Sequence, residues 1–202
     1  MVIVDLNLGN IGSIQNMVKK IGISAEISNN VDVIAKASKL ILPGVGAFDR
    51  GMNQIKSLGL MDILNKKVKD DRTPILGICL GMQLLTHGSE EGVEKGLGWI
   101  DAHTIKFDFE GRNNLRVPHM GWNNTHFHSD AILFDNMYDE ARFYYVHSYH
   151  VICNDNNDCV ATCQYGINVC AAIQNSNVFG TQFHPEKSHK FGQVILKNFA
   201  EC

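Results

Sequence analysis

The chain has 202 residues, 45% of them hydrophobic, and a formal net charge of −3. This length accommodates one domain with a sizeable core, and we expect a single domain over residues 1–202. The small net charge gives no support for a partner that is nucleic acid or an anionic membrane, so neither is expected. The first residues lack the basic flank and long apolar run of a signal peptide, and no apolar stretch of about 18 residues predicts a membrane span.

In the first half of the chain, apolar runs alternate with amphipathic segments. The apolar runs predict strands at residues 1–6, 25–28, 39–42 and 75–78. The segments between them predict helices at residues 11–21, 31–37, 50–57 and 60–70. This alternation is typical of an α/β domain with a mostly parallel sheet, in which functional loops follow the C-terminal ends of the strands.

The pattern changes after residue 98. Residues 104–109 alternate between apolar and polar, as in a half-exposed strand, and residues 110–114 predict a turn. Further strands are expected at residues 115–118, 142–147, 159–164, 169–174 and 178–183, and a final helix at about residues 190–199. We therefore expect a partly antiparallel C-terminal extension of the sheet.

Cys79 lies between a buried strand and a helix predicted to begin near Leu80. Gly77 and Gly81 flank it two residues away on either side, the spacing of a nucleophile elbow with sulfur in place of a hydroxyl. The strained turn would push the side chain above the sheet, and Cβ atoms at the flanking positions would collide. Unpaired N–H groups at the helix start favour the thiolate. Alone the motif is weak, because a lone cysteine is more often a buried structural residue.

A second motif, residues 180–188 (GTQFHPEKS), supplies a base. His184 follows an apolar strand, and Pro185 stiffens the turn after it. Glu186 is close enough to accept a hydrogen bond from the imidazole and fix its tautomer. A histidine alone is more often a satisfied structural residue, but the combination of Cys79, His184 and Glu186 predicts a catalytic triad.

The loop at residues 43–46 (PGVG) ends another central strand at the level of Cys79. Its glycines let backbone N–H groups approach a ligand or flip. We predict an oxyanion hole formed by the N–H of Val45 or Gly46 together with that of Leu80, the residue after the nucleophile. Taken alone the loop would be a plain strand-to-helix turn, and its pairing with the cysteine turn favours the functional interpretation.

The cysteines and histidines give little support for a metal site. Cys79 is assigned to the predicted triad, and the other five cysteines are an odd number, so a reducing, cytoplasmic compartment is expected. Cys159 and Cys163 have a weak zinc-ligand spacing, and no metal is predicted. The histidines of the middle segment are interpreted as surface or core residues: His119, His126, His128, His147 and His150.

Residues 76–83 (LGICLGMQ) and 183–186 (FHPE) closely resemble the class I glutamine amidotransferases. Residues 43–48, 118–123 and 146–149 resemble, within that group, the glutaminase subunits of imidazole glycerol phosphate synthase in histidine biosynthesis. The resemblance covers nearly the whole chain. It implies a flavodoxin-like three-layer α/β sandwich with a mostly parallel sheet and an antiparallel C-terminal extension.

The resemblance also implies a reaction without a metal or organic cofactor. Glutamine would be hydrolysed to glutamate and ammonia through a γ-glutamyl thioester on Cys79. The residues implied to hold the amino acid head group are Gln83, Ser148 and Tyr149, and those implied to line the pocket are Gly46 and Tyr144. Ordinary packing stays open for Tyr144, and a surface position stays open for Gln83.

Residues 118–123 (PHMGWN) predict a tight turn that exposes Met120 and Trp122, which suits a protein interface. A core hairpin is an equally good interpretation. The resemblance implies that this turn, together with Asn10 and Lys187, contacts a separate (β/α)8 synthase subunit that receives the ammonia. It also implies that the loop at residues 43–46 is misaligned until the partner binds its ligand.

Other functions remain open at this stage. A paralogous glutaminase could supply ammonia to a sugar amidotransferase in surface polysaccharide synthesis, and residues 10–22 look somewhat like that group. A cysteine peptidase or deglycase and an inactive regulatory module are disfavoured by the intact triad and Gln83. Residues 89–92 (SEEG) are family-like but suggest no chemistry, and a solvated helix end is the default interpretation.

Overall fold

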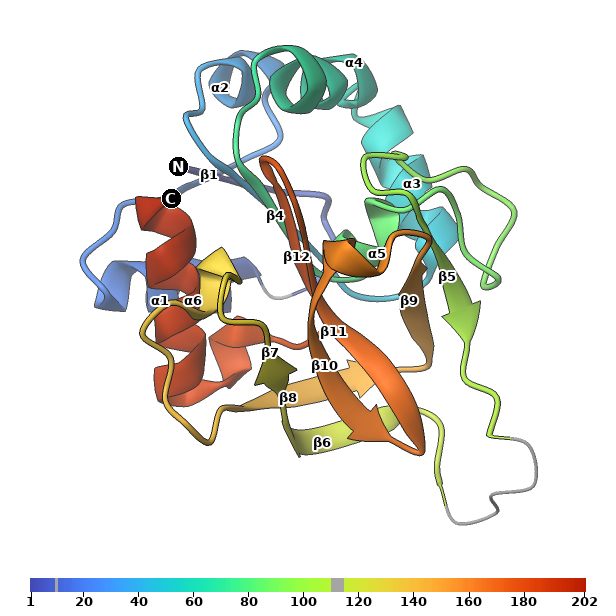
Figure 1. Cartoon of the computed structure of the whole chain (residues 1–202). Coiled ribbons are helices and arrows are strands. Elements are labelled where there is room, and N and C mark those ends of the chain that lie inside the picture. Colours follow the sequence, from blue (N-terminus) through green and yellow to red (C-terminus); the bar gives the residue numbers. More distant parts are fainter. Residues whose placement is uncertain (10, 110–114) are drawn as a thin grey trace.

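The computed structural model describes residues 1–9, 11–109 and 115–202, and an eight-stranded sheet runs through it (Figure 1). The strand order is β2-β1-β3-β4-β12-β11-β10-β7. Five strands are parallel: β1 (Val2–Val4), β2 (Glu26–Ser28), β3 (Leu40–Gly44), β4 (Ile75–Cys79) and β12 (Val178–Thr181). Antiparallel pairing then adds β11 (Ile167–Asn175), β10 (Cys159–Tyr165) and β7 (His126–Phe127). The predicted mostly parallel sheet with an antiparallel extension is confirmed.

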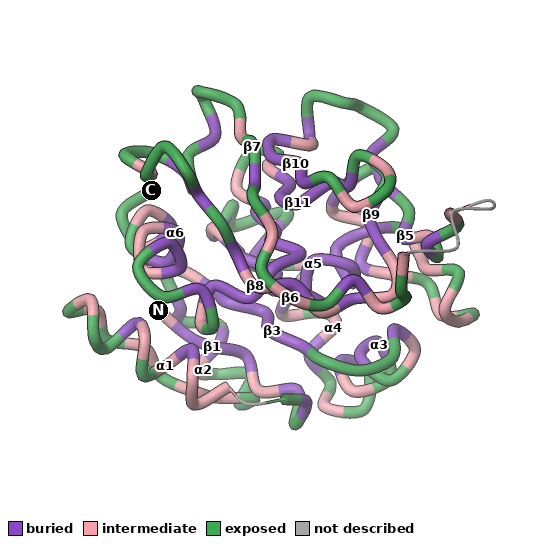
Figure 2. The backbone as a smooth tube through the Cα atoms, turned by 90° about the horizontal axis from the view of Figure 1, so that it is seen from below, coloured by how far each residue is buried: buried purple, intermediate pink, exposed green. Residues whose placement is uncertain are grey.

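Helices cover both faces of the sheet. One face packs on α1 (Ile11–Lys20) and α6 (His189–Glu201), and the other on α2 (Val31–Ala35), α3 (Phe48–Ser57), α4 (Met61–Asn65) and α5 (Leu80–Leu84). Successive residues of β3 alternate between the two cores, because side chains of a strand point to opposite faces. Leu40 and Leu42 join the core under α2–α5, and Ile41 joins the core under α1 and α6. The three-layer sandwich is therefore confirmed, and Figure 2 shows the buried backbone concentrated in the strands between the exposed loops.

Small antiparallel sheets flank the central one. They pair β5 (Ala102–Lys106) with β9 (Tyr149–Cys153), and β6 (His119–Asn124) with β8 (Arg142–His147). Short helical turns complete the described chain: η1 (Lys66–Asp70), η2 (Ile132–Phe134), η3 (Asn156–Asp158) and η4 (Pro185–Lys187). Among the described residues, no helix is both long and apolar enough to cross a bilayer.

The prediction for residues 115–123 was wrong in its details. The strand begins at His119, not at residue 115, and the segment predicted as a tight turn is β6, paired along its length with β8. Pro118 precedes the strand, and Gly121 is a residue type common in turns, but its pairing with Tyr145 of β8 outweighs that local preference. The turn predicted at residues 110–114 lies outside the described residues.

The C-terminal ends of three central strands meet at one edge of the sheet. Register aligns Gly44 of β3 with Cys79 of β4, and Ile78 of β4 with Thr181 of β12. The loops that leave β3, β4 and β12 therefore start side by side, although β4 and β12 are about a hundred residues apart in the sequence.

Candidate active site

Cys79 ends β4 and is the N-cap of α5, with φ 56° and ψ −110°. Such a positive φ is strained for a residue with a side chain and is found where a turn must present a functional group. A Cβ atom on Gly77 would lie 2.7 Å from the Gly81 carbonyl carbon, and one on Gly81 would lie 1.8 Å from the Leu42 carbonyl oxygen. Both glycines are required by close backbone approach, as the nucleophile-elbow prediction states.

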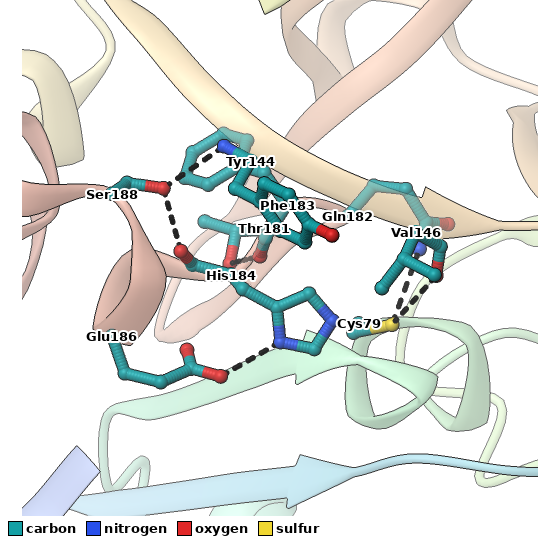
Figure 3. Close-up of polar contacts among 9 residues, drawn as sticks. All are labelled: Cys79, Tyr144, Val146, Thr181, Gln182, Phe183, His184, Glu186 and Ser188. Atoms are coloured by element: carbon teal, nitrogen blue, oxygen red, sulfur yellow. Dashed lines mark hydrogen bonds and ion pairs between the residues drawn. The ribbon is translucent and has the colours of Figure 1, made fainter. Parts of the chain in front are cut away.

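His184 lies beside Cys79, and Glu186 supports it from the opposite side of the ring (Figure 3). The His184 Nδ1 and Glu186 Oε1 atoms are 2.7 Å apart, and both side chains are at least 90% buried. The other ring nitrogen, Nε2, is buried, has no hydrogen-bond partner among the described residues, and points toward the Cys79 sulfur in the figure. An imidazole held in this way by a carboxylate is oriented for proton transfer at sulfur.

Backbone contacts hold His184 in place. Its N–H donates to the Tyr144 carbonyl at 2.9 Å, and its own carbonyl accepts from the Ser188 hydroxyl at 2.6 Å. The Ser188 oxygen in turn accepts from the Tyr144 N–H at 3.0 Å. These bonds tie the loop after β12 to β8.

The pKa of His184 is raised to about 10. Burial lowers it, but the proximity and charges of Cys79 and Glu186, the latter hydrogen-bonded to Nδ1, outweigh the burial. The imidazole therefore holds a proton at neutral pH when the cysteine sulfur is anionic, and that proton is available for a leaving group.

A cavity of about 390 Å³ opens over Cys79 and His184. Of the predicted site residues it is lined by Val45, Gly46, Cys79, Leu80, Gln83, Ser148, Tyr149 and His184. Its other lining residues are Ala47, Glu91, Pro118, Val146 and His147. The structure thus brings the loops after β3, β4 and β8 together around one pocket.

Two backbone segments of the cavity suit the predicted oxyanion hole. Leu80 is the first residue of α5, where an N–H group has no partner within the helix. Val45 and Gly46 line the cavity from the loop after β3, and Gly46 has φ 101°, a conformation that side chains rarely adopt. The oxyanion hole and the reorientation of this loop both remain predictions.

Gln83 is buried, so the alternative of a solvent-facing residue is wrong. Its Nε2 donates to the Tyr149 carbonyl at 3.2 Å and to the Gln182 Oε1 at 3.0 Å. Both amide hydrogens are therefore engaged by the protein, and the amide oxygen is the group left to meet a ligand.

Glu91 also lines the cavity, although the sequence suggests no chemistry for it. Its Oε2 accepts from the Phe48 N–H at 2.8 Å, which ties the segment at residues 89–92 to the start of α3. Asp49 makes the same link by accepting from the N–H groups of Val93 and Glu94 at 3.0 and 2.9 Å. The adjacent acidic residues Glu90 and Glu91 were the only sequence signal for this role. Nothing in that signal shows that the loop at residues 89–92 folds back onto the site.

Tyr144 is not among the residues that line the cavity. Its ring lies 5.6 Å from the Lys187 Nζ and 6.3 Å from the Trp122 ring. Trp122 stacks on His189 at 5.4 Å, and Met120 is 61% exposed. The structure therefore groups Tyr144 with the residues predicted to contact a partner.

The predicted exposure of Met120 and Trp122 is confirmed. Lys187 is also exposed and follows His184 in the loop after β12. Asn10, the remaining predicted contact residue, lies outside the described residues.

The buried histidines form a cluster beside the cavity, which His147 itself lines. His119 Nδ1 lies 2.9 Å from His147 Nε2, and His147 Nδ1 lies 2.8 Å from the Tyr149 carbonyl. Burial lowers the pKa of His119 to about 4 and that of His147 to about 3. These two and His150 are core histidines, whereas His126 and His128 are exposed.

The cysteines form no disulfide, and all six are free thiols. Among the residues that the structure describes, no group of three or more His, Cys, Asp and Glu side chains is placed to hold a metal ion.

Comparison with known proteins accounts for this geometry. The family model "Glutamine amidotransferase class-I" matches residues 2–202. The chain belongs to the class I glutamine amidotransferase family. Cys79 and the His184–Glu186 pair are the parts of this chain that suit acyl transfer from an amide.

Two relatives share much of the sequence. "Imidazole glycerol phosphate synthase subunit HisH 2" of Methanococcus maripaludis is 54% identical, over 98% of this chain and 96% of that protein. The protein of the same name from Pseudomonas aeruginosa is 47% identical, over 99% and 98%.

Solved structures support the fold. One described as a glutamine amidotransferase superposes with a TM-score of 0.77 at 17% identity, over 99% of this chain and 97% of that one. Another, described as a putative GMP synthase protein of Thermoplasma acidophilum, gives a TM-score of 0.73 at 20% identity, over 99% and 92%. At these identities the likeness concerns the fold alone.

Proposed function

We propose that this chain is the glutaminase subunit of an imidazole glycerol phosphate synthase, which makes ammonia for a partner subunit in histidine biosynthesis. The observation that carries the glutaminase chemistry is the position of the His184 imidazole beside Cys79. The His184 Nδ1, on the side away from the sulfur, is hydrogen-bonded to the buried Glu186 carboxylate. The names of relatives with 54% and 47% identity support the pathway.

The proposed reaction begins with transfer of the Cys79 proton to His184 Nε2. The thiolate attacks the side-chain amide carbon of glutamine, and the N–H groups of Leu80 and Val45 stabilise the negative charge on oxygen. The carbon–nitrogen bond then breaks, His184 protonates the leaving nitrogen, and ammonia departs from a γ-glutamyl thioester.

The second half-reaction consumes water. His184 takes a proton from the water as its oxygen attacks the thioester carbon, the carbon–sulfur bond breaks, and glutamate leaves. Glu186 keeps the imidazole oriented in both halves and stabilises its positive form. The first proton that His184 accepts leaves with ammonia and the second passes to the Cys79 sulfur, so the enzyme is regenerated.

We assign the head group of glutamine to the acceptors that remain inside the cavity. The Gln83 amide oxygen and the Glu91 carboxylate belong to residues that line the same pocket, and they suit the α-ammonium group. Ser148 and Tyr149 line the pocket from the β8–β9 turn and are proposed to meet the α-carboxylate. Gly46 closes the side of the pocket near the oxyanion hole.

The proposed partner is a (β/α)8 synthase subunit bound over the exposed aromatic group of β6 and the loop after β12. Met120, Trp122 and Lys187 lie on this surface, next to Tyr144. Ammonia that passes directly into the partner stays unprotonated, because it does not meet bulk water. Asn10 is retained as a proposed contact.

The second candidate function, ammonia supply to a sugar amidotransferase, would use the same site with another acceptor. The names of the relatives favour the histidine pathway. Rescue of a histidine auxotroph that lacks its glutaminase subunit tests the choice: growth without histidine supports the proposal, and failure by a stably expressed protein rejects this pathway.

The enzymatic test is glutamate release from glutamine by the purified protein, with and without the synthase subunit and its ligand. We expect low activity alone, a large rise with the liganded partner and none in Cys79→Ala. Full activity in Cys79→Ala would refute the mechanism.

We also propose that the chain acts as one domain. Because its six thiols are free, we propose that it acts in the reducing cytoplasm.

A further inference from the structure

Gln182 contacts the nucleophile, and none of the steps above uses it. Its side chain is fully buried, and its amide nitrogen Nε2 donates to the Cys79 sulfur at 3.8 Å (Figure 3). The contact follows from the sheet: Thr181 is aligned with Ile78, so the next residues, Gln182 and Cys79, leave adjacent strands together. His184, two residues on, meets the same sulfur from another direction.

The orientation of the Gln182 amide is fixed by a chain of hydrogen bonds. The Tyr149 carbonyl can only accept, so the Gln83 atom 3.2 Å from it is the amide nitrogen. That same nitrogen lies 3.0 Å from the Gln182 amide, which must present its oxygen there. The remaining end of the Gln182 amide, its N–H group, therefore faces the sulfur.

We propose that Gln182 is a further catalytic residue of this site, whose amide N–H stabilises the Cys79 thiolate. A hydrogen bond to an ionised acceptor is about twice as strong as one between neutral groups, and burial away from water increases its effect. The amide thus contacts the sulfur from one direction, and the imidazole of His184 faces it from another. Each of these two groups is oriented by a hydrogen bond with a different side chain. Gln83 orients the Gln182 amide, and Glu186 orients the imidazole of His184.

The amide and the imidazole have different tasks at the sulfur. His184 must gain and lose a proton during the reaction, so its charge changes from step to step. The Gln182 amide does not titrate, and its N–H group is available to the thiolate in every state of the imidazole. The amide therefore favours the ionised sulfur at both points where it forms, before the attack on glutamine and when the carbon–sulfur bond of the thioester breaks.

Other ionisable groups also surround the sulfur. His184 faces it from the loop after β12 with Glu186 behind, and Glu91 and His147 line the same cavity. A test of Gln182 must therefore change the amide alone and leave these groups in place.

The experiment follows alkylation of Cys79 by iodoacetamide as a function of pH, on the isolated full chain, with the Cys79 peptide quantified by mass spectrometry. Gln182→Leu removes the donor at similar volume, and we expect the midpoint to rise by about one pH unit, which slows alkylation about tenfold at pH values below the wild-type midpoint. Gln182→Glu should raise the midpoint further, because its carboxylate repels the thiolate. The matched control is Gln164→Leu on β10, which should leave the midpoint unchanged.

An unchanged midpoint in folded Gln182→Leu overturns the proposal. If that variant does not fold, the wild-type protein decides: the NMR signal of the Gln182 side-chain amide proton should shift with the alkylation midpoint, and this shift should be absent in Cys79→Ala. A missing shift in the wild-type protein overturns the proposal as well. The proposal deepens the glutaminase function, but alkylation needs no glutamine, so failure of glutamine hydrolysis is a separate result that rejects only that function.

Discussion

His119 and His147 share a buried hydrogen bond of 2.9 Å, and His147 lines the cavity over Cys79. The Tyr149 carbonyl requires a donor at His147 Nδ1, so His147 Nε2 accepts and His119 Nδ1 donates. Asn123, on the exposed strand β6, completes the chain at 3.2 Å from His119 Nε2. This arrangement needs both rings neutral.

The neutral His119–His147 pair predicts that the folded protein loses stability in acid. Burial lowers the folded-state pKa of His147 to about 3 and of His119 to about 4, below the ordinary value of 6.5, so the unfolded chain binds more protons in this window. Stability should therefore fall as the pH drops from about 6.5 to about 4, by up to about 1.4 kcal/mol per pH unit for each histidine. Urea unfolding of the wild-type protein and His147→Gln measures this, and equal slopes in the two proteins would contradict the account.

Glu186 should control the charge of His184. The carboxylate favours the imidazolium, so Glu186→Gln should lower the pKa of His184 from its raised value of about 10. Loss of an oriented base should also reduce kcat about 100-fold, with a smaller effect on KM. Ring-proton NMR titration and steady-state kinetics check both effects. A His184 titration unaffected by the substitution would show that the 2.7 Å contact has no electrostatic role.

Gly81 should be indispensable for the fold of the cysteine turn. A Cβ atom there would meet the Leu42 carbonyl oxygen at 1.8 Å, so Gly81→Ala should cost about 3 kcal/mol or more. Gly88→Ala is the matched control, since its nearest neighbour would lie at 3.8 Å, an ordinary contact. Chemical denaturation compares the two, and similar small losses would mean that the backbone around Cys79 adjusts easily.

The exposed part of β6 should contribute to partner binding and not to folding. Met120 is 61% exposed, and Met120→Glu should weaken binding of the synthase subunit at least about tenfold because it puts a charge into an apolar contact. Ile152, 46% exposed on β9, provides the control substitution Ile152→Glu. Titration calorimetry measures the two affinities, and equal affinities would remove β6 from the interface.

Local sequence signals were enough for the triad and for most of the sheet. The geometry of the cysteine turn could be predicted from Gly77, Cys79 and Gly81 alone, because close backbone approach leaves no room for a side chain at either glycine. The apolar runs of the central strands and the helical spacing of α1 are equally local, and these elements were predicted close to their observed bounds.

The residues that could not be predicted depend on contacts between distant segments. Glu91 enters the cavity only because its loop is bonded to the start of α3, and β6 is a strand only because β8 pairs with it. Gln182 acquires its orientation from Gln83, about a hundred residues earlier in the chain. None of these partners is visible in a short stretch of sequence.

The central claim is that Cys79 becomes covalently attached to the glutamyl group during turnover. Acid quenching of the protein during reaction with glutamine, followed by mass spectrometry of its cysteine peptides, tests this claim most directly. We predict a γ-glutamyl adduct on the Cys79 peptide alone, absent from Cys79→Ala. Continued hydrolysis by Cys79→Ala, or an adduct on another cysteine with Cys79 unmodified, would contradict it.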